Sequence, residues 1–260
     1  MEARKKKAVP GSKPLGRTGL WPRAAGDIMM NRPEERRGPA RDAPAREGRA
    51  AGTEMIRNIV FDMGRVIIRF DPETFMDRAG VRDPEDRKLI RNELFRSVEW
   101  AQMDEGTLTE ETAWLIIAPR IPARLRETAK ELLFHWACPA EEIPGMEDLV
   151  RRLKEAGYGI WLLSNASAMQ PEYWGKLPVS RYFDGTLISC DVRVVKPSRE
   201  IYRLFTEKFS LAPEECLFID DKPANVAGAV ACGWQGIVFH GDAGELERKL
   251  AAAGVVAGRR

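Results

Sequence analysis

Four short segments of the chain carry polar side chains directly after an apolar run or just before a helical pattern. They are FDMG with Asp62, WLLSNAS with Ser164 and Asn165, VVKPSREIY with Lys196, and CLFIDDKPANVAGA with Asp220 and Asp221. Each side chain taken singly has an ordinary structural explanation as a helix cap, a turn residue or a surface lysine. Together they offer three carboxylates, one cation and one hydroxyl group, which form a chemically complementary set.

The charges in this set require a counter-ion. Two like charges about 4 Å apart repel each other by about 4 kcal/mol at an effective dielectric constant near 20. Lys196 supplies one positive charge, and a hard divalent cation would supply the rest. Mg²⁺ suits a site of oxygen ligands that leaves positions open for water and phosphate. A metal beside an unpaired carboxylate such as Asp62 is typical of phosphoryl transfer, in which the carboxylate attacks the oriented phosphorus atom.

Short apolar runs must position these segments. The runs cover residues 56–61, 159–163, 185–189, 215–219 and 236–239. Patterns with apolar residues at three-to-four spacing separate the later runs, and they cover residues 146–156, 198–209 and 225–232. Pro197 suits the first turn of a helix. This alternation predicts an α/β fold with a doubly wound, mostly parallel, Rossmann-like sheet and helices on both faces.

A long helical stretch interrupts the alternation between the first and second predicted strands. Asp71 and Pro72 make a good helix start, with Asp as the N-cap and Pro at the first position. Further helices are predicted over 109–117 and 123–136. Such an insertion would lie beside the carboxyl end of the first strand, where open α/β sheets bind ligands. The predicted division of the chain is a tail over 1–54, an α/β core over 55–71 and 139–260, and a helical cap over 72–138.

Composition separates the tail from the rest. The 260 residues are 44% hydrophobic and 31% charged, which is ordinary for a globular protein. Residues 1–54 hold 13 Lys/Arg against 7 Asp/Glu, whereas residues 55–260 carry a formal charge of −4. The tail has six Pro, seven Gly and hardly an apolar cluster, so we predict that it is disordered. The mildly acidic folded part gives no general reason to expect nucleic-acid binding.

The cysteines and the apolar stretches indicate in which cellular compartment the protein works. Cys138, Cys190, Cys216 and Cys232 lie far apart without a C-x-x-C pair, which predicts buried thiols in a reducing compartment. No span approaches the roughly 20 apolar residues that cross a bilayer, and no signal-peptide h-region is visible. We therefore expect a cytoplasmic enzyme without a membrane partner. The oligomeric state is left open.

The order, spacing and flanks of the four segments resemble the haloacid dehalogenase-like (HAD) hydrolase superfamily over residues 55–250. FDMGRVI, LLSNAS, VVKPSREIY and FIDDKPANVAGA follow one another in the order typical of the superfamily. GMEDLVRRLKEAGYGIWLLSN is typical of the approach to the second motif. The Asp-x-Gly opening followed by a helical cap resembles the bacterial α-D-glucose-1-phosphate phosphatase branch.

The resemblance implies a Mg²⁺-dependent phosphatase of small phosphate esters, with a sugar phosphate as the favoured substrate. It makes Asp62 the nucleophile, which would form an aspartyl-phosphate intermediate. Ser164 and Asn165 would bind the phosphoryl oxygens, and Lys196 would stabilise the charge on nucleophile and phosphate. The metal ligands that it implies are Asp62, the backbone carbonyl of Gly64, Asp221 and, more loosely through water, Asp220.

Gly64 and Arg65 depart from the usual pattern. Most phosphatases of the superfamily have Asp at the place of Gly64, where it protonates the leaving oxygen and later activates water. General acid–base help contributes about 10²–10⁴-fold, whereas phosphate monoester hydrolysis can be accelerated by about 10²¹. We therefore expect a modest phosphatase whose proton comes from the cap, from water or from a good leaving group. Arg65 would either contact the substrate phosphate or point away into a salt bridge.

Two other functions stay open. A 2-haloacid dehalogenase shares the fold, the Asp nucleophile and a Ser-Asn motif, but it needs no metal and leaves the acidic pair unexplained. A catalytically weak binding or regulatory member would fit Gly64, but not the otherwise intact set of polar groups. Substrate choice would lie in the cap, although aromatic residues at helical spacing are more often bundle core. The candidates for the roof of the pocket are Trp100, Trp114, His135 and Trp136.

Overall fold

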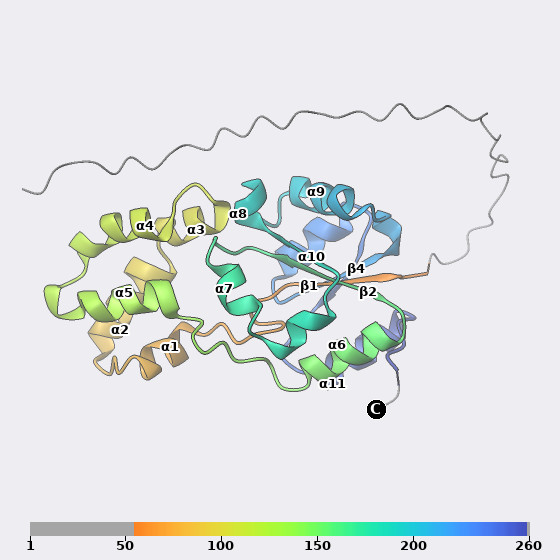
Figure 1. Ribbon diagram of the computed structural model, residues 1–260, viewed down its shortest axis with the longest axis horizontal. Helices are drawn as coiled ribbons and strands as arrows, with labels where there is room; N and C mark the ends of the chain where they lie inside the picture. Colours follow the sequence, from red (N-terminus) through yellow and green to blue (C-terminus); the bar gives the residue numbers. More distant parts are fainter. Residues whose placement is uncertain (1–54, 259–260) are drawn as a thin grey trace, which may run out of the picture. The chain divides into compact units, whose positions relative to one another are not determined.

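The computed structural model describes residues 55–258, which contain a five-stranded parallel sheet in the order β3-β2-β1-β4-β5 (Figure 1). The strands are β1 Asn58–Phe61, β2 Gly159–Ser164, β3 Gly185–Ile188, β4 Cys216–Asp220 and β5 Gln235–Val238. Every predicted strand is present within about two residues of its expected bounds, so the prediction of a doubly wound α/β fold is confirmed. The prediction for residues 1–54 lies outside the described residues.

Six helices of the described residues lie outside the stretch between β1 and β2; the three predicted over 146–156, 198–209 and 225–232 are confirmed, and the other three were not predicted. The six are α6 Met146–Glu155, α7 Gln170–Trp174, α8 Ser189–Val192, α9 Arg199–Phe209, α10 Pro223–Val230 and α11 Ala243–Ala252, with 3₁₀ turns at Pro178–Tyr182 and Pro213–Glu215. The placement of Pro197 in the first turn of a helix was wrong, because Ser198 is the N-cap and α9 begins one residue later. The Asn165 side chain hydrogen-bonds both backbone groups of Lys196, which keeps this segment in the preceding loop.

Side chains of β1 alternate between apolar clusters on the two faces of the sheet, as the two-residue period of a strand requires. Ile59 and Phe61 pack in a cluster with residues of α6 and α11, whereas Val60 packs in a cluster with residues of α9. Figure 1 shows α6 and α11 on one side of the sheet and α9 on the other. All of β1 is buried, as expected for the central strand of a parallel sheet.

The segment between β1 and β2 forms a helical insertion, which we define as α1 to α5. Its elements are α1 Pro72–Arg78, α2 Pro84–Ile90, a π-helical turn Arg91–Phe95, α3 Val98–Glu105, α4 Glu110–Ile117, 3₁₀ turns Ala118–Arg120 and Ala123–Leu125, and α5 Arg126–His135. Asp71 caps α1 as predicted, and Thr109 caps α4. The insertion packs around an apolar cluster of its own, which includes Phe75, Ile90 and Ile117. The division of the chain into core and cap domains stays a prediction.

Gly106 joins the insertion to the sheet region at close range. It ends α3 with a φ of 75°, and a Cβ atom there would overlap the backbone of Cys190. Gly80 has a similar φ of 74° but has nothing within 4 Å of its Cβ position. A substitution at Gly80 therefore measures the cost of the left-handed backbone conformation alone.

We expect Gly106→Ala to lower the free energy of unfolding more than Gly80→Ala. The left-handed conformation should cost each variant about 1–2 kcal/mol. Overpacking against Cys190 should add about 1–3 kcal/mol at Gly106 only. Urea unfolding of both variants measures the difference. Equal losses of unfolding free energy would show that the contact between Gly106 and the Cys190 backbone tolerates an added methyl group.

The cysteine prediction was correct only in part. Cys216 is buried, but Cys190 and Cys232 are half-buried and Cys138 is exposed. Cys138 lies in the turn that follows α5, where the chain leaves the insertion, and few side chains cover it there. All four thiols are free.

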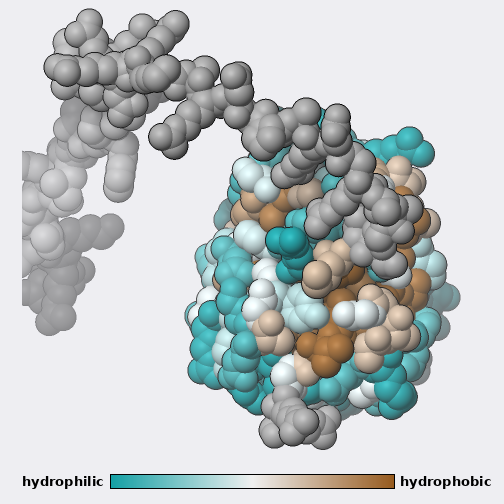
Figure 2. Space-filling view, turned by 90° about the vertical axis from the view of Figure 1, so that its right-hand side faces the viewer, coloured by the Kyte–Doolittle hydropathy of each residue, from teal (hydrophilic) through white to brown (hydrophobic). Residues whose placement is uncertain are grey.

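Figure 2 shows the end of the described unit at which β1 begins, opposite the insertion. Hydrophilic residues occupy much of this surface, and apolar residues gather near its middle. Within residues 55–258, no helix combines the length and apolar character that crossing a bilayer would need.

Candidate active site

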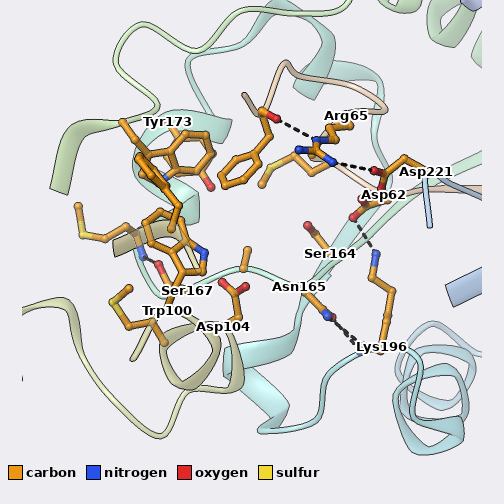
Figure 3. Close-up of a pocket in the computed structure, with 18 of the residues that line it drawn as sticks. Asp62, Arg65, Trp100, Asp104, Ser164, Asn165, Ser167, Tyr173, Lys196 and Asp221 are labelled. Carbon is orange, nitrogen blue, oxygen red and sulfur yellow. Dashed lines mark hydrogen bonds and ion pairs between the residues drawn. The ribbon is translucent and has the colours of Figure 1, made fainter. Parts of the chain in front are cut away.

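The loops that follow β1, β2 and β4 meet the loop before α9 at one edge of the sheet. Asp62, Ser164, Lys196 and Asp221 all line a cavity of about 280 Å³ at this edge (Figure 3). The backbone N–H of Asp62 donates to the Ile219 carbonyl at 2.8 Å, so the pairing of β1 with β4 continues one residue past β1. The structure therefore brings together the side chains that the sequence placed at separate strand ends.

Lys196 lies at the centre of the charged groups. Its Nζ atom donates to Asp62 Oδ1 at 2.7 Å, to Asp220 Oδ2 at 2.8 Å and to the Leu163 carbonyl at 2.9 Å. Only 1% of the side chain is exposed. Burial opposes the charge, but the two carboxylates outweigh it and raise the pKa of Lys196. The side chain is therefore a fixed ammonium ion.

Asp62 is buried but faces the cavity. Burial raises the pKa of its carboxyl from an ordinary value of 3.8 to about 6, with Lys196 opposing the rise and Asp220 adding to it. The group is consequently ionised in the larger part of the molecules at neutral pH. A carboxylate with little water around it and one ammonium partner can act as a nucleophile.

The two adjacent carboxylates at the carboxyl end of β4 have different surroundings. Asp220 is fully buried, and its oxygens accept hydrogen bonds from Lys196 Nζ, from Asn225 Nδ2 at 2.9 and 3.0 Å, and from the Lys222 N–H at 2.8 Å. Asp221 faces the cavity, and burial together with Asp220 raises its pKa. Asp221 is therefore the member of the pair that can meet a ligand directly.

Arg65 lies at the edge of the same cavity. Its guanidinium is 3.8 Å from Asp221 Oδ2, and its Nε atom donates to the Phe70 carbonyl at 2.9 Å. Of the two alternatives for Arg65, the salt bridge is present, but the side chain still lines the cavity instead of pointing away from it. The neighbouring Gly64 carbonyl accepts no hydrogen bond from residues 55–258, so it too can bind a ligand.

The oxygen atoms at this site fit a hard divalent cation. One carboxylate oxygen from each of Asp62, Asp220 and Asp221 lies within 4.8 Å of the others. Carboxylate and carbonyl oxygens are the ligands that Mg²⁺ takes in proteins. Because Asp220 already accepts three sets of protein hydrogen bonds, the oxygens left for an ion are those of Asp62, Asp221 and the Gly64 backbone.

Ser164 ends β2 and Asn165 follows it, but the two side chains differ in how far they are free to bind a ligand. Ser164 is buried and lines the cavity, and Figure 3 draws no bond from its hydroxyl to another of the residues shown. Asn165 uses its amide on the backbone of Lys196, accepting from N–H at 2.8 Å and donating to C=O at 3.1 Å. Asn165 therefore fixes the loop that carries the lysine.

Aromatic side chains form the other end of the cavity. They are Phe70, Phe95, Trp100, Trp136 and Tyr173. Figure 3 shows Trp100 and Tyr173 on one side of the cavity and Lys196 and Asp221 on the other. The prediction of roof residues was correct for Trp100 and Trp136 but wrong for Trp114, which packs on the cluster inside the insertion, and for His135, which is exposed.

Two carboxylates of the cavity were missed by the sequence analysis. They are Asp104 in the last turn of α3 and Glu110 in the first turn of α4. Glu110 accepts a hydrogen bond from the Ser167 hydroxyl. The spacing of Trp100 and Asp104, four residues apart on one helix, would have placed both on the same face and could have revealed Asp104.

Comparison with known proteins identifies the family. Residues 56–233 match the haloacid dehalogenase-like hydrolases, and the chain belongs to this family of enzymes. The resemblance seen in the four motifs is confirmed at this level.

Individual relatives match the chain to different extents. Drimenol cyclase drtB of Aspergillus calidoustus is 26% identical over 206 residues, which cover 75% of this chain but only 36% of that protein. D-ribitol-5-phosphate phosphatase of Bacteroides thetaiotaomicron is 27% identical over 185 residues, which cover 66% of this chain and 86% of that protein. The chain therefore spans about a third of the first relative and most of the second.

Solved structures share the fold. A HAD family enzyme of Bacteroides thetaiotaomicron, in complex with magnesium and inorganic phosphate, has a TM-score of 0.57 at 22% identity. The match covers 74% of this chain and 98% of that chain, so it includes the sheet region and the insertion of the described unit.

Proposed function

We propose that this hydrolase is a Mg²⁺-dependent phosphatase of small phosphate esters that works through an aspartyl-phosphate intermediate. The observation that supports this most directly is the buried Lys196 ammonium between Asp62 and Asp220, with Asp221 facing the same cavity. The site thereby combines a charged nucleophile, a fixed cation and open oxygen ligands. These are the groups that transfer of a phosphoryl dianion needs.

The metal would be held by Asp62, the Gly64 carbonyl and Asp221, with Asp220 behind them. When bound, the ion would neutralise charge on the phosphate and orient it for attack. Asp220 would act on the site through Lys196, because its oxygens are already engaged by protein donors. Arg65 lines the same cavity and would offer its guanidinium to the substrate phosphate.

The chain's own residues would divide the reaction between them. An oxygen of Asp62 attacks phosphorus, and the bond from phosphorus to the ester oxygen breaks. Lys196 keeps Asp62 ionised and stabilises the charge on the phosphoryl group, and the Ser164 hydroxyl donates to a phosphoryl oxygen. Asn165 holds the backbone of Lys196 in position. Water then attacks the phosphorus of the aspartyl phosphate and releases inorganic phosphate.

The helical insertion would act as the cap of this site. Phe95, Trp100, Leu133 and Trp136 of the insertion line the cavity together with the catalytic loops. Apolar walls that exclude bulk water strengthen the electrostatic interactions beneath them. We propose a sugar phosphate as the substrate, as in the glucose-1-phosphate phosphatase branch, because one relative, from Bacteroides thetaiotaomicron, is a D-ribitol-5-phosphate phosphatase.

A 2-haloacid dehalogenase remains the alternative enzyme, since it would use the same nucleophile without a metal. The cavity argues against it, because Asp221 and the Gly64 carbonyl are placed beside Asp62 where a metal-free reaction has no need of them. A non-catalytic binding role is disfavoured because Asp62, Ser164, Lys196 and Asp221 are all present and line one cavity.

A phosphate-release screen over sugar phosphates, nucleotides and p-nitrophenyl phosphate tests the proposal. We expect hydrolysis of several compounds in the presence of Mg²⁺ and its loss by more than about 10²-fold after EDTA, because the ion supplies charge neutralisation worth several kcal/mol. Restoring Mg²⁺ should restore the rate. Activity on 2-chloropropionate that survives EDTA would favour the dehalogenase, and no hydrolysis of any compound would favour the binding role.

A further inference from the structure

One carboxyl group of the cavity has no role in the proposed reaction. Four carboxylates line the cavity, namely Asp62, Asp104, Glu110 and Asp221. Asp62 is the proposed nucleophile, Asp221 is proposed to hold the metal, and Glu110 accepts from the Ser167 hydroxyl. Asp104 is the one among them whose carboxylate has neither a hydrogen bond nor an ion pair within residues 55–258.

The backbone of Asp104 is fixed to the sheet side of the site. Its carbonyl accepts a hydrogen bond from the Ser189 hydroxyl, which itself accepts from the Ala166 N–H at 3.0 Å. Ser189 is fully buried directly after β3, and Gly106 packs directly on the Cys190 backbone. The last turn of α3 is thus attached to the loops that carry the catalytic groups, although α3 belongs to the insertion.

The side chain points into the space between the two ends of the cavity. Figure 3 shows Asp104 between Trp100, at the aromatic end, and Ser164, at the charged end. A phosphate ester with its phosphoryl group at Asp62 and its organic part among the aromatic rings would place the ester oxygen between these ends. That is where Asp104 lies.

The surroundings of Asp104 favour its protonated form. Burial raises its pKa to about 7, Asp62 and Glu110 add to the rise, and Lys222 and Lys196 oppose it. The position at the C-terminal end of α3 acts in the same direction as burial, because the helix dipole is negative there. Such a carboxyl can both give and accept a proton near neutral pH.

The phenol of Tyr173 is a less suitable proton donor than the Asp104 carboxyl. Tyr173 also lines the cavity, but burial raises its pKa above the usual range of a phenol, with Asp104 and Glu110 adding to the rise. A phenol of this kind is a weak acid at neutral pH.

We propose that Asp104 protonates the leaving oxygen, the task that a carboxylate at position 64 would perform if Gly64 were Asp. This inference rests on the proposed phosphatase function. As Asp62 attacks, the electron pair of the breaking phosphorus–oxygen bond goes to the ester oxygen, which takes the proton of Asp104 and leaves as an alcohol. The Asp104 carboxylate then accepts a proton from the water molecule whose oxygen attacks phosphorus, and phosphate leaves Asp62.

The test compares leaving groups of different basicity with the full chain and Mg²⁺. p-Nitrophenolate leaves readily as an anion, whereas the alkoxide of glycerol 2-phosphate needs a proton. In Asp104→Asn we expect the ratio of kcat/KM for glycerol 2-phosphate to kcat/KM for p-nitrophenyl phosphate to fall by about 10²-fold or more. Glu105→Gln changes the next carboxyl on α3, which does not line the cavity, and it should keep the wild-type ratio.

The outcomes separate this role from the proposed function. A loss by the same factor on both substrates, or no loss on either, would overturn the role of Asp104 as a proton donor. Wild-type protein that hydrolyses neither substrate with Mg²⁺ would instead reject the phosphatase proposal, and this role with it.

A rescue variant tests the proposal without relying only on the loss seen in Asp104→Asn. A Cβ atom at Gly64 would meet only Phe70 Cβ at 3.6 Å, which is ordinary contact, so the backbone at this position accepts a side chain's first atom without overlap. Adding Gly64→Asp to Asp104→Asn should restore most of the lost ratio by supplying another carboxyl at a position that lines the same cavity. If the double variant folds, as circular dichroism can check, and the ratio stays at the level of the single variant, the proposal is wrong.

Discussion

Asp62→Asn should abolish hydrolysis while the protein keeps its fold. The amide has the shape of the carboxylate but cannot form an acyl phosphate, so we expect turnover to fall by roughly 10⁴–10⁶-fold, as when an essential nucleophile is removed. The fold should persist, because β1 ends before Asp62 and the apolar packing of the strand is unchanged. Phosphate release and thermal unfolding of the same preparation measure the two effects.

Asp242→Asn is a matched control for this change. Asp242 also follows a strand of the sheet, and its carboxylate caps α11 through the Glu245 N–H. Asn caps a helix about as well as Asp, and Asp242 does not line the cavity. We expect wild-type turnover in the control. An Asp62→Asn protein with more than a few per cent of wild-type turnover would contradict the assignment of the nucleophile.

Lys196→Met should cost both activity and stability. Methionine is unbranched and only one heavy atom shorter than lysine, but it leaves Asp62 and Asp220 without their shared cation in a buried site. Removing one partner of a buried ion pair costs about 3–5 kcal/mol, and we expect turnover to fall by at least about 10³-fold through lost charge stabilisation. Urea unfolding measures the first effect and phosphate release the second, with the exposed Lys130→Met as the control.

The stability loss in Lys196→Met should depend on pH. In the wild type, the folded-state pKa of Asp62 is raised to about 6 from an ordinary value of 3.8, even with Lys196 lowering it. Without the lysine this pKa should rise further, so the folded state binds more protons than the unfolded state and loses stability as the pH rises from about 4 through 6 and beyond. The variant should therefore be closer to the wild type at pH 5 than at pH 8. If the difference in unfolding free energy between variant and wild type is the same at pH 5 and pH 8, the charges of Asp62 and Asp220 are compensated by another group and the prediction is wrong.

The sheet and the charged end of the site could be predicted because one physical rule connects them. Short apolar runs such as 159–163 are too brief for helices and alternate with longer amphipathic patterns, which fixes a parallel sheet. The carboxyl ends of parallel strands lie at one edge, so Asp62, Ser164 and Asp221 had to approach one another. Lys196 followed from charge balance, and the structure places it between two carboxylates.

The interior of the insertion was harder to predict, because α3 reverses the usual pattern of burial. Val98 is 69% exposed, whereas Glu99 is buried and pairs with Arg120 at 2.8 Å. An apolar residue outside and a charged residue inside hide the three-to-four spacing on which a helix prediction depends. Asp104 was missed for a related reason, since a polar residue on the inner face of such a helix is indistinguishable in sequence from one on the outer face.

Asn165 shows a different limit. Ser164 and Asn165 were both expected to bind phosphate, but the structure shows that the Asn165 amide hydrogen-bonds the backbone of Lys196. The two segments are far apart in sequence, and nothing in either segment predicts that they exchange a pair of hydrogen bonds.

Acid quenching during turnover, followed by peptide mass spectrometry, tests the central claim most directly. The account predicts a phosphoryl group on the peptide that contains Asp62, its removal by neutral hydroxylamine, and its absence from Asp62→Asn. A burst of alcohol release with the phosphoryl group on Ser164 or on any other side chain would contradict the account.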